Sequence, residues 1–262
     1  MIGNDHARAA ARLLVQHWDG GTRLDQLPDV IRPGTRAEGY AIQAQWMERT
    51  TAPLFGWKIA ATSAAGQRHI NVDGPLAGRL LAEMVIGDAA TVSLATNLMR
   101  VAELEIAFRF GADLVPRSEP YSVDEVMAAV ATLHPAIELP DSRYTDFITV
   151  GAPQLIADDA CANLFILGPA VTRPWRHIDL AAHRVSATVA GKSRHDGQGA
   201  NVLGDPRLAL AWITNELSGL GIAITAGQVV TTGTCVVPIP VLPGDEVFAR
   251  YGEFGSLSVK FA

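Results

Sequence analysis

The chain has 262 residues, of which 48% are hydrophobic and 18% charged, with a formal net charge of −6. This composition excludes a largely disordered chain and argues against a nucleic-acid partner, whose phosphates favour a basic protein surface. The length fits one large unit, and the low charged fraction suggests apolar surface buried between the copies of a homo-oligomer.

The sequence offers no targeting segment or disulfide framework. Its two cysteines, Cys161 and Cys235, are too few for such a framework and do not form a CxxC motif. The opening residues MIGNDHARAA lack the apolar core of a signal peptide. No apolar run approaches the roughly 20 residues of a membrane span. We therefore expect a soluble cytoplasmic protein without a membrane partner.

Residues 1–85 are predicted to form a helical lobe. Apolar side chains recur at helical spacing over residues 7–18, which predicts a first helix. A second helix is expected over residues 35–50, opened by a capping box between Thr35 and Glu38. The sequence GWKIAAT after it is short and apolar, and indicates a buried strand.

Residues 86–262 are predicted to be rich in β-strands and continuous with the helical lobe, in one α+β unit. The segment VAELEIAFRF alternates between apolar and other residues, as a strand does. Two helices interrupt the strands: one opened by a Ser122–Glu125 capping box and running to about Leu133, and one after Asp205-Pro206. Further strands are expected at HPAIELPD, at LFILGPAV, in a hairpin near residue 190 and over the last forty residues.

Common catalytic motifs are missing from the sequence. No G-x-G-x-x-G follows a strand, and the AGKS of residues 190–193 lacks the glycine that a phosphate loop needs at the position of Ser186. The seven histidines form no H-x-H or H-E-x-x-H, and no G-x-S-x-G is present. Nucleotide-phosphate binding, a histidine-based zinc site and a serine hydrolase are therefore disfavoured.

Acidic residues stand out in two of the predicted strands. Glu103 and Glu105 share one face of VAELEIAFRF, because residues i and i+2 of a strand point the same way, and Glu138 lies within the apolar PAIEL. Three carboxylates without histidine or cysteine suit a hard ion such as Mg²⁺ or Mn²⁺. A solvated strand face explains the same pattern, and the pattern alone leaves both interpretations open.

A series of ordered motifs resembles the 2-keto-4-pentenoate hydratase family, which includes the 4-oxalocrotonate decarboxylases and belongs to the fumarylacetoacetate hydrolase superfamily. The resemblance runs from about Gly56 to the C-terminus and rests on GWKIAATSAAGQRHINVDGPLAGRLL, ELEIAF, PAIELPDSR, LIADDA, GANVLGDP, TGT and PGDEV. It implies a mixed β-sheet roll or barrel of the fumarylacetoacetate hydrolase type, with a helical N-terminal lobe.

The resemblance also implies roles for single residues. Glu103, Glu105 and Glu138 match the metal ligands of the family, which use Mg²⁺ or Mn²⁺, and Lys58 and Asp73 match its catalytic positions. Substrate-binding positions match Thr232, Gly233, Thr234, Asp159 and Cys161. The last two depart from the family, which commonly has asparagine and serine there, so the substrate specificity of this chain is expected to differ if they touch the substrate.

The implied reaction is hydration of a small 2-hydroxy-2,4-dienoate, the enol of an unsaturated 2-oxo acid, to a 4-hydroxy-2-oxo acid in aromatic-compound catabolism. Lys58 is expected to move protons, with a pKa lowered by apolar surroundings and a nearby metal. Asp73, which precedes Gly74-Pro75, has either a catalytic role or a turn-capping role. Arg143 is expected to pair with Asp141 or Asp146.

Two other functions stay open from the sequence. A decarboxylase of a 2-oxo-3-enedioate such as 4-oxalocrotonate needs the same metal and the same enolate. A non-catalytic partner subunit of a hydratase–decarboxylase complex is the alternative of a different class, against which the intact Lys58 and the three glutamates argue. Hydrolysis of an acylpyruvate is disfavoured, because no His–Glu pair that could activate water is recognisable in the N-terminal part.

Overall fold

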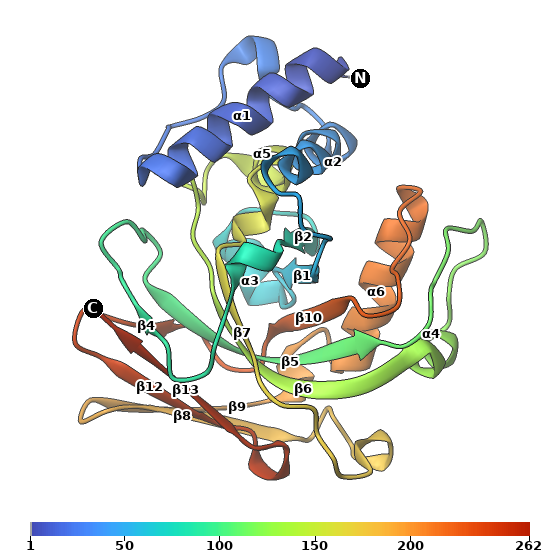
Figure 1. The fold of residues 1–262 in the computed structure, drawn as a ribbon, viewed down its shortest axis with the longest axis vertical. Coiled ribbons are helices and arrows are strands. Elements are labelled where there is room, and N and C mark those ends of the chain that lie inside the picture. Colours follow the sequence, from blue (N-terminus) through green and yellow to red (C-terminus); the bar gives the residue numbers. More distant parts are fainter. Residues whose placement is uncertain (1) are drawn as a thin grey trace.

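The structure, a computed structural model, describes residues 2–262 as two β-sheets flanked by helices (Figure 1). The α-helices are α1 Asn4–Gly20, α2 Arg36–Ala44, α3 Ala64–His69, α4 Val123–Ala129, α5 Gly151–Ala157 and α6 Pro206–Gly219. The strands are β1 Gly56–Ala60, β2 Leu76–Leu80, β3 Val85–Ile86, β4 Thr91–Val92, β5 Val101–Phe110, β6 Val130–Leu139, β7 Leu164–Leu167, β8 Arg184–Val189, β9 Ser193–Gln198, β10 Val229–Thr234, β11 Ile239–Pro240, β12 Glu246–Arg250 and β13 Ser256–Phe261. The expected α+β class is confirmed.

The larger sheet has the order β2-β1-β10-β5-β6-β7-β3, with β11 pairing to β5. Its centre is the antiparallel pair β5 and β6, whose long strands curve through the middle of the molecule (Figure 1). Leu104, Ile106 and Phe108 of β5 are fully buried. The alternation read from the sequence therefore places one face of β5 in the main core.

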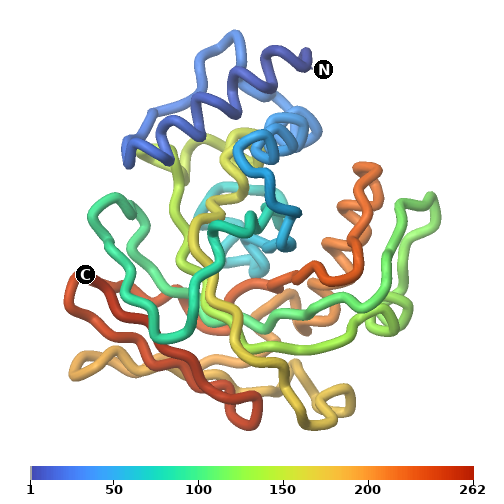
Figure 2. Tube along the Cα trace, in the orientation of Figure 1, coloured from blue at the N-terminus to red at the C-terminus, as the bar shows by residue number. Residues whose placement is uncertain are grey.

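The smaller sheet, in the order β4-β13-β12-β8-β9, packs against the larger one. Ala249 of β12 and Val259 of β13 belong to the same hydrophobic cluster as Leu104 and Ile137 of the larger sheet. The hydroxyl of Tyr251 donates a hydrogen bond to the carbonyl of Ala136, which ties the end of β12 to β6. The C-terminus lies at this smaller sheet, far from the N-terminal helices (Figure 2).

The N-terminal helices cover one end of the larger sheet. Leu14 of α1 and Trp46, in the 3-10 helix Gln45–Arg49 that follows α2, are fully buried in their shared cluster. The side-chain amide of Gln43 in α2 donates to the carbonyls of Ala77 in β2 and Ile156 in α5, at 2.7 and 3.1 Å. These contacts hold α5 against the edge of the sheet formed by β2.

The three predicted helix starts are confirmed. Thr35 accepts a hydrogen bond from the Glu38 N–H, and Asp205 accepts one from the Arg207 N–H. Ser122 and Glu125 form the complete reciprocal capping box. Such caps are local in sequence, so they can be recognised without knowledge of the tertiary structure.

Two predicted boundaries are wrong or displaced. The helix expected to reach Leu133 ends at Ala129, because Val130–Leu139 pairs with β5 and tertiary pairing overrides local helix propensity. The helical lobe expected to span residues 1–85 contains β1 and β2, which belong to the larger sheet. The purely helical part therefore ends at Arg49. Over residues 2–262, every helix is too short or too polar to cross a membrane.

Candidate metal centre and active site

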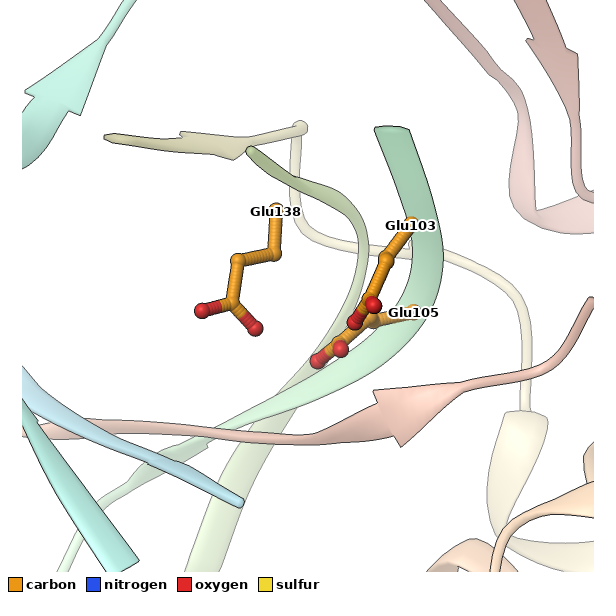
Figure 3. Close-up of side chains that lie close together, drawn as sticks. All are labelled: Glu103, Glu105 and Glu138. Carbon is orange, nitrogen blue, oxygen red and sulfur yellow. The ribbon is translucent and has the colours of Figure 1, made fainter. Parts of the chain in front are cut away.

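Three glutamate side chains meet at the centre of the larger sheet. Glu103 of β5 lies directly opposite Glu138 of β6, and Glu105 follows two residues later on the same face as Glu103. One carboxylate oxygen from each lies within 4.8 Å of the other two. The carboxylates point toward one another (Figure 3). Glu105 and Glu138 are fully buried, which rules out a solvated strand face for both.

The three carboxyl groups are strongly perturbed. Burial, followed by the charge of Glu138, raises the pKa of Glu103 to about 7 even though Lys58 opposes this shift. Burial and the two neighbouring carboxylates raise the pKa of Glu105 well above its usual value. Burial also raises the pKa of Glu138, against the opposing effect of Lys58. A carboxyl group with a pKa raised in this way is only partly ionised at neutral pH unless a cation lies close to it.

Two buried carboxylate oxygens are free to bind a cation. Glu105 Oε1 and Glu138 Oε2 are buried and, within residues 2–262, have no hydrogen-bond partner. Glu105 Oε2 accepts hydrogen bonds from the Thr231 hydroxyl and from the Gly233 N–H at 3.0 Å, which fixes the orientation of that carboxylate. Oxygen ligands with open positions are the donor set that Mg²⁺ and Mn²⁺ prefer, so these residues fit a hard divalent ion.

Lys58 on β1 reaches the same centre. Its Nζ lies 3.0 Å from Glu138 Oε1 and 2.9 Å from the carbonyl oxygen of Ala160. The residue is 2% exposed, and its neighbours Trp57 and Ile59 are buried as well. The lysine therefore does not reach solvent, and a buried ammonium faces the three carboxylates.

The pKa of Lys58 is expected to fall beside a metal, but in the metal-free arrangement it lies above its ordinary value. Burial acts to lower the pKa of Lys58, but the charges of Glu138 and Glu103 outweigh it and hold the pKa above the ordinary value for lysine. The sequence suggested apolar surroundings, whereas the contacts of Nζ are anionic. A divalent cation among the carboxylates would weaken this effect.

The TGT motif supports the carboxylates through its backbone. Gly233 has φ +103°, and a Cβ there would lie 2.2 Å from the Thr62 hydroxyl oxygen, so only glycine fits. Thr232 donates its hydroxyl to the Ile106 carbonyl, and Thr234 donates to the Val236 carbonyl. The hydroxyl that reaches a glutamate belongs to Thr231, which the sequence reasoning missed although it directly precedes the motif.

Asp159 and Cys161 are buried and flank Ala160, whose carbonyl accepts the hydrogen bond from Lys58. Asp159 Oδ1 accepts the Arg79 N–H at 2.6 Å, and burial raises the pKa of Asp159 to about 7. Burial, and then the charge of Asp158, raises the pKa of Cys161 to about 12, so its sulfur is a protonated thiol. Cys161 and Cys235 are both buried, as expected of packed cysteines.

Asp73 lies apart from this buried centre. Its side chain is 80% exposed and forms an ion pair with Arg36 at 2.9 Å. Of its two expected roles, this exposed position argues against the catalytic one. The pairing expected for Arg143 is also wrong, because Arg143 forms a fully buried ion pair with Asp158 while Asp141 pairs with Arg23. Asp158 lies 15 residues after Arg143 in the sequence, and the intervening α5 brings its side chain back beside the arginine.

We expect the metal-free protein to lose stability as the pH rises. Between the usual value of 4.5 and about 7, unfolded Glu103 releases its proton while folded Glu103 keeps it, so the free energy of unfolding falls across this window. Mg²⁺ should therefore raise the melting temperature more at pH 8 than at pH 5. Calorimetric scans at both pH values, with and without Mg²⁺, measure this difference. An equal Mg²⁺ effect at both would contradict it.

The sequence and the structure resemble those of known proteins. Residues 39–262 match the profile of the fumarylacetoacetate (FAA) hydrolase C-terminal family. A 2-keto-4-pentenoate hydratase of Paraburkholderia xenovorans is 31% identical over 96% of this chain and 93% of its own. A 2-hydroxyhexa-2,4-dienoate hydratase of Comamonas testosteroni is 33% identical over 79% of this chain and 78% of its own.

A solved structure shares the whole fold. The 4-oxalocrotonate decarboxylase of Pseudomonas putida G7, complexed with magnesium and adipate, superposes with a TM-score of 0.90 at 26% identity. The superposition covers 100% of this chain and 99% of that one. The fumarylacetoacetate hydrolase fold expected from the sequence motifs is thereby confirmed. With the family profile covering most of its length and curated relatives similar along it, the chain belongs to the fumarylacetoacetate hydrolase family.

Proposed function

We propose that this protein is a metal-dependent hydratase that adds water to a small 2-hydroxy-2,4-dienoate. The observation that carries the proposal is the buried contact between the Lys58 ammonium and the cluster of Glu103, Glu105 and Glu138. The similarity to proteins named as hydratases of 2-keto-4-pentenoate and 2-hydroxyhexa-2,4-dienoate supports it.

The charges of the site suit an anionic substrate once a cation is bound. Three carboxylates and a divalent ion together carry a charge of −1, which the Lys58 ammonium balances. Held by the three glutamates, Mg²⁺ or Mn²⁺ would supply Lewis-acid stabilisation to an enolate oxygen of a bound 2-oxo acid. The magnesium in the 4-oxalocrotonate decarboxylase complex supports Mg²⁺ as the first metal to test.

Lys58 is the group we assign to proton transfer. An ammonium has three N–H bonds, and within residues 2–262 Glu138 and the Ala160 carbonyl account for two of them. The third is available to a substrate atom or a water molecule. Asp73 is exposed and paired with Arg36, so we assign it no step in the reaction.

The reaction that fits these groups has two stages. First the substrate loses its 2-hydroxyl proton and gains a proton at C5, which converts the dienol into a 2-oxo-3-enoate. Water then adds across the conjugated bond, with its oxygen at C4 and a hydrogen at C3. The sum is one water added, and we assign to Lys58, by direct contact or through one water, the delivery and acceptance of protons on the carbon chain.

Decarboxylation of a 2-oxo-3-enedioate is the second candidate. The 0.90 TM-score to a 4-oxalocrotonate decarboxylase favours it, and both reactions pass through an enolate. The intact lysine and carboxylate cluster favour either enzyme over a non-catalytic partner subunit.

The two reactions are separated by their products. We expect the purified protein with Mg²⁺ to convert 2-hydroxypenta-2,4-dienoate into a product heavier by one water, detected by mass spectrometry. It should release little CO₂ from 4-oxalocrotonate under the same conditions. Rapid CO₂ release without hydration of the dienoate would replace the hydratase assignment by the decarboxylase one.

A further inference from the structure

An unusual backbone segment lies behind Lys58. Asp159, Ala160 and Cys161 form a 3-10 turn after α5 and have φ values of 53°, 51° and 62°. Residues other than glycine rarely adopt this left-handed conformation, and three in succession persist only where the surrounding structure enforces it. We call Asp159–Cys161 the left-handed segment. Backbone strain of this kind suggests that the segment has a function.

The left-handed segment contacts the lysine directly. The carbonyl oxygen of Ala160, its central residue, accepts a hydrogen bond from Lys58 Nζ at 2.9 Å. On its other side the same nitrogen lies 3.0 Å from Glu138 Oε1. The ammonium is therefore held between one carboxylate of the metal centre and one backbone carbonyl. A shift of that carbonyl would move the ammonium relative to the centre.

The carboxyl group of Asp159 fastens the segment to β2. Asp159 Oδ1 accepts the backbone N–H of Arg79 at 2.6 Å. Gly78, the preceding residue, pairs with Lys58 in the β1–β2 ladder. A Cβ on Gly78 would lie 2.5 Å from the Asp159 carbonyl oxygen and 2.9 Å from Lys58 Cδ. The segment, β2 and the stem of the lysine thus meet at one point, which only glycine leaves open.

Both ends of the left-handed segment are anchored. Before it, the Asp158 carboxylate forms the buried ion pair with Arg143 and accepts the Ser142 hydroxyl at 2.7 Å. At its last residue, the carbonyl of Cys161 accepts the Asp141 N–H at 3.0 Å. These bonds join the ends of the segment to residues 141–143, whereas the Asp159 carboxyl ties the segment to β2, the strand beside the lysine.

We propose that Asp159 is a positioning residue for the proton-transfer step: its carboxyl oxygen holds the left-handed segment on β2 so that the Ala160 carbonyl fixes Lys58 Nζ against the metal centre. This inference rests on the proposed hydratase function for its kinetic consequence. The role requires an acceptor oxygen rather than a negative charge. Asparagine keeps the acceptor oxygen and the shape of the side chain, so it should fulfil the role of Asp159. Alanine lacks the oxygen and should not.

The test compares three variants of the full-length protein. Asp159→Ala should lower kcat by about 100-fold, the effect of a misplacement of about 1 Å in a catalytic group, with KM and the Mg²⁺ dissociation constant within about threefold of wild type. Asp159→Asn should keep kcat within about threefold. Thr214→Val is the matched control, because it removes another buried side-chain hydrogen bond, to the Leu210 carbonyl in α6, away from the site. It should leave kcat unchanged.

A second measurement reads the position of Lys58 without turnover. The chain has three lysines, of which Lys192 and Lys260 are about half exposed, so the Lys58 ammonium is the one shielded from rapid proton exchange with water. In protein labelled with ¹⁵N-lysine, its NMR signal should be visible in wild type, in Asp159→Asn and in Thr214→Val. It should shift or broaden beyond detection in Asp159→Ala.

The outcomes separate the two proposals. An Asp159→Ala protein with wild-type kcat, or with an unchanged Lys58 signal, overturns the positioning role. An equal kcat loss in Asp159→Asn overturns it as well, since the charge would then be what matters, and an equal loss in Thr214→Val assigns the effect to general destabilisation. Absence of turnover in the wild type counts against the hydratase proposal only, because the NMR comparison still decides the position of Lys58.

Discussion

Replacing Lys58 by methionine is expected to lower kcat for dienoate hydration by about 10²–10⁴-fold, the usual contribution of a positioned acid–base group. Methionine fills a similar volume in the buried site, so the fold should persist. The Mg²⁺ dissociation constant should stay equal or fall, because the substitution removes a positive charge that lies 3.0 Å from Glu138, one of the proposed metal ligands. Steady-state kinetics and calorimetric Mg²⁺ titration of the same preparation measure both quantities.

This opposite response of turnover and metal affinity distinguishes Lys58 from a merely structural residue. Lys192→Met is the matched control, since Lys192 is half exposed and pairs with Asp245 away from the centre. It should change neither quantity. Wild-type kcat in Lys58→Met would remove the lysine from the mechanism, and a loss of Mg²⁺ binding would show that its role is to organise the carboxylates.

Replacing Glu105 by glutamine should have the second large effect. Glutamine Oε1 can still accept the Thr231 hydroxyl and the Gly233 N–H, so the side chain keeps its place. The substitution removes one ligand charge, and Mg²⁺ affinity should fall by more than about 100-fold, since outer-shell changes alone cost about 10–100-fold. Turnover at ordinary Mg²⁺ concentrations should fall with it.

The same substitution should not destabilise the metal-free protein. Burial and the charges of Glu138 and Glu103 hold the pKa of Glu105 well above its usual value, so the ionised form of Glu105 is unfavourable and a neutral replacement should not lower stability at pH 8. Denaturant unfolding of metal-free protein should give a free energy of unfolding at least equal to that of wild type. Glu246→Gln, at an exposed position, is the control for the removal of one negative charge. Unchanged Mg²⁺ affinity in Glu105→Gln would exclude Glu105 as a ligand.

The clustering of the three glutamates could be predicted because most of its pattern is local. Glu103 and Glu105 must share a face of one strand, whatever the fold, and the match to family motifs paired them with Glu138. The buried Lys58 was foreseeable for the same reason, from apolar neighbours on both sides. The helix caps at Ser122 and Asp205 depend on a few adjacent residues and were also correctly predicted.

Features that depend on contacts distant in sequence were missed. The pairing of Arg143 with Asp158 and the bond from Thr231 to Glu105 join segments that only the tertiary fold brings together. The left-handed segment contains no glycine, so nothing in its composition indicates positive φ values. Burial of Lys58 could be read from the sequence, but the contact of its Nζ with Glu138, whose charge raises the pKa of Lys58 in the metal-free protein, could not.

The metal dependence of hydration tests the central claim most directly. Protein stripped of metal with a chelator is titrated with Mg²⁺ while the conversion of 2-hydroxypenta-2,4-dienoate into its hydrated product is followed. Our account predicts negligible turnover without metal and a rise that saturates at one Mg²⁺ per chain, at the site formed by Glu103, Glu105 and Glu138. Hydration at an undiminished rate in the metal-free protein would contradict it.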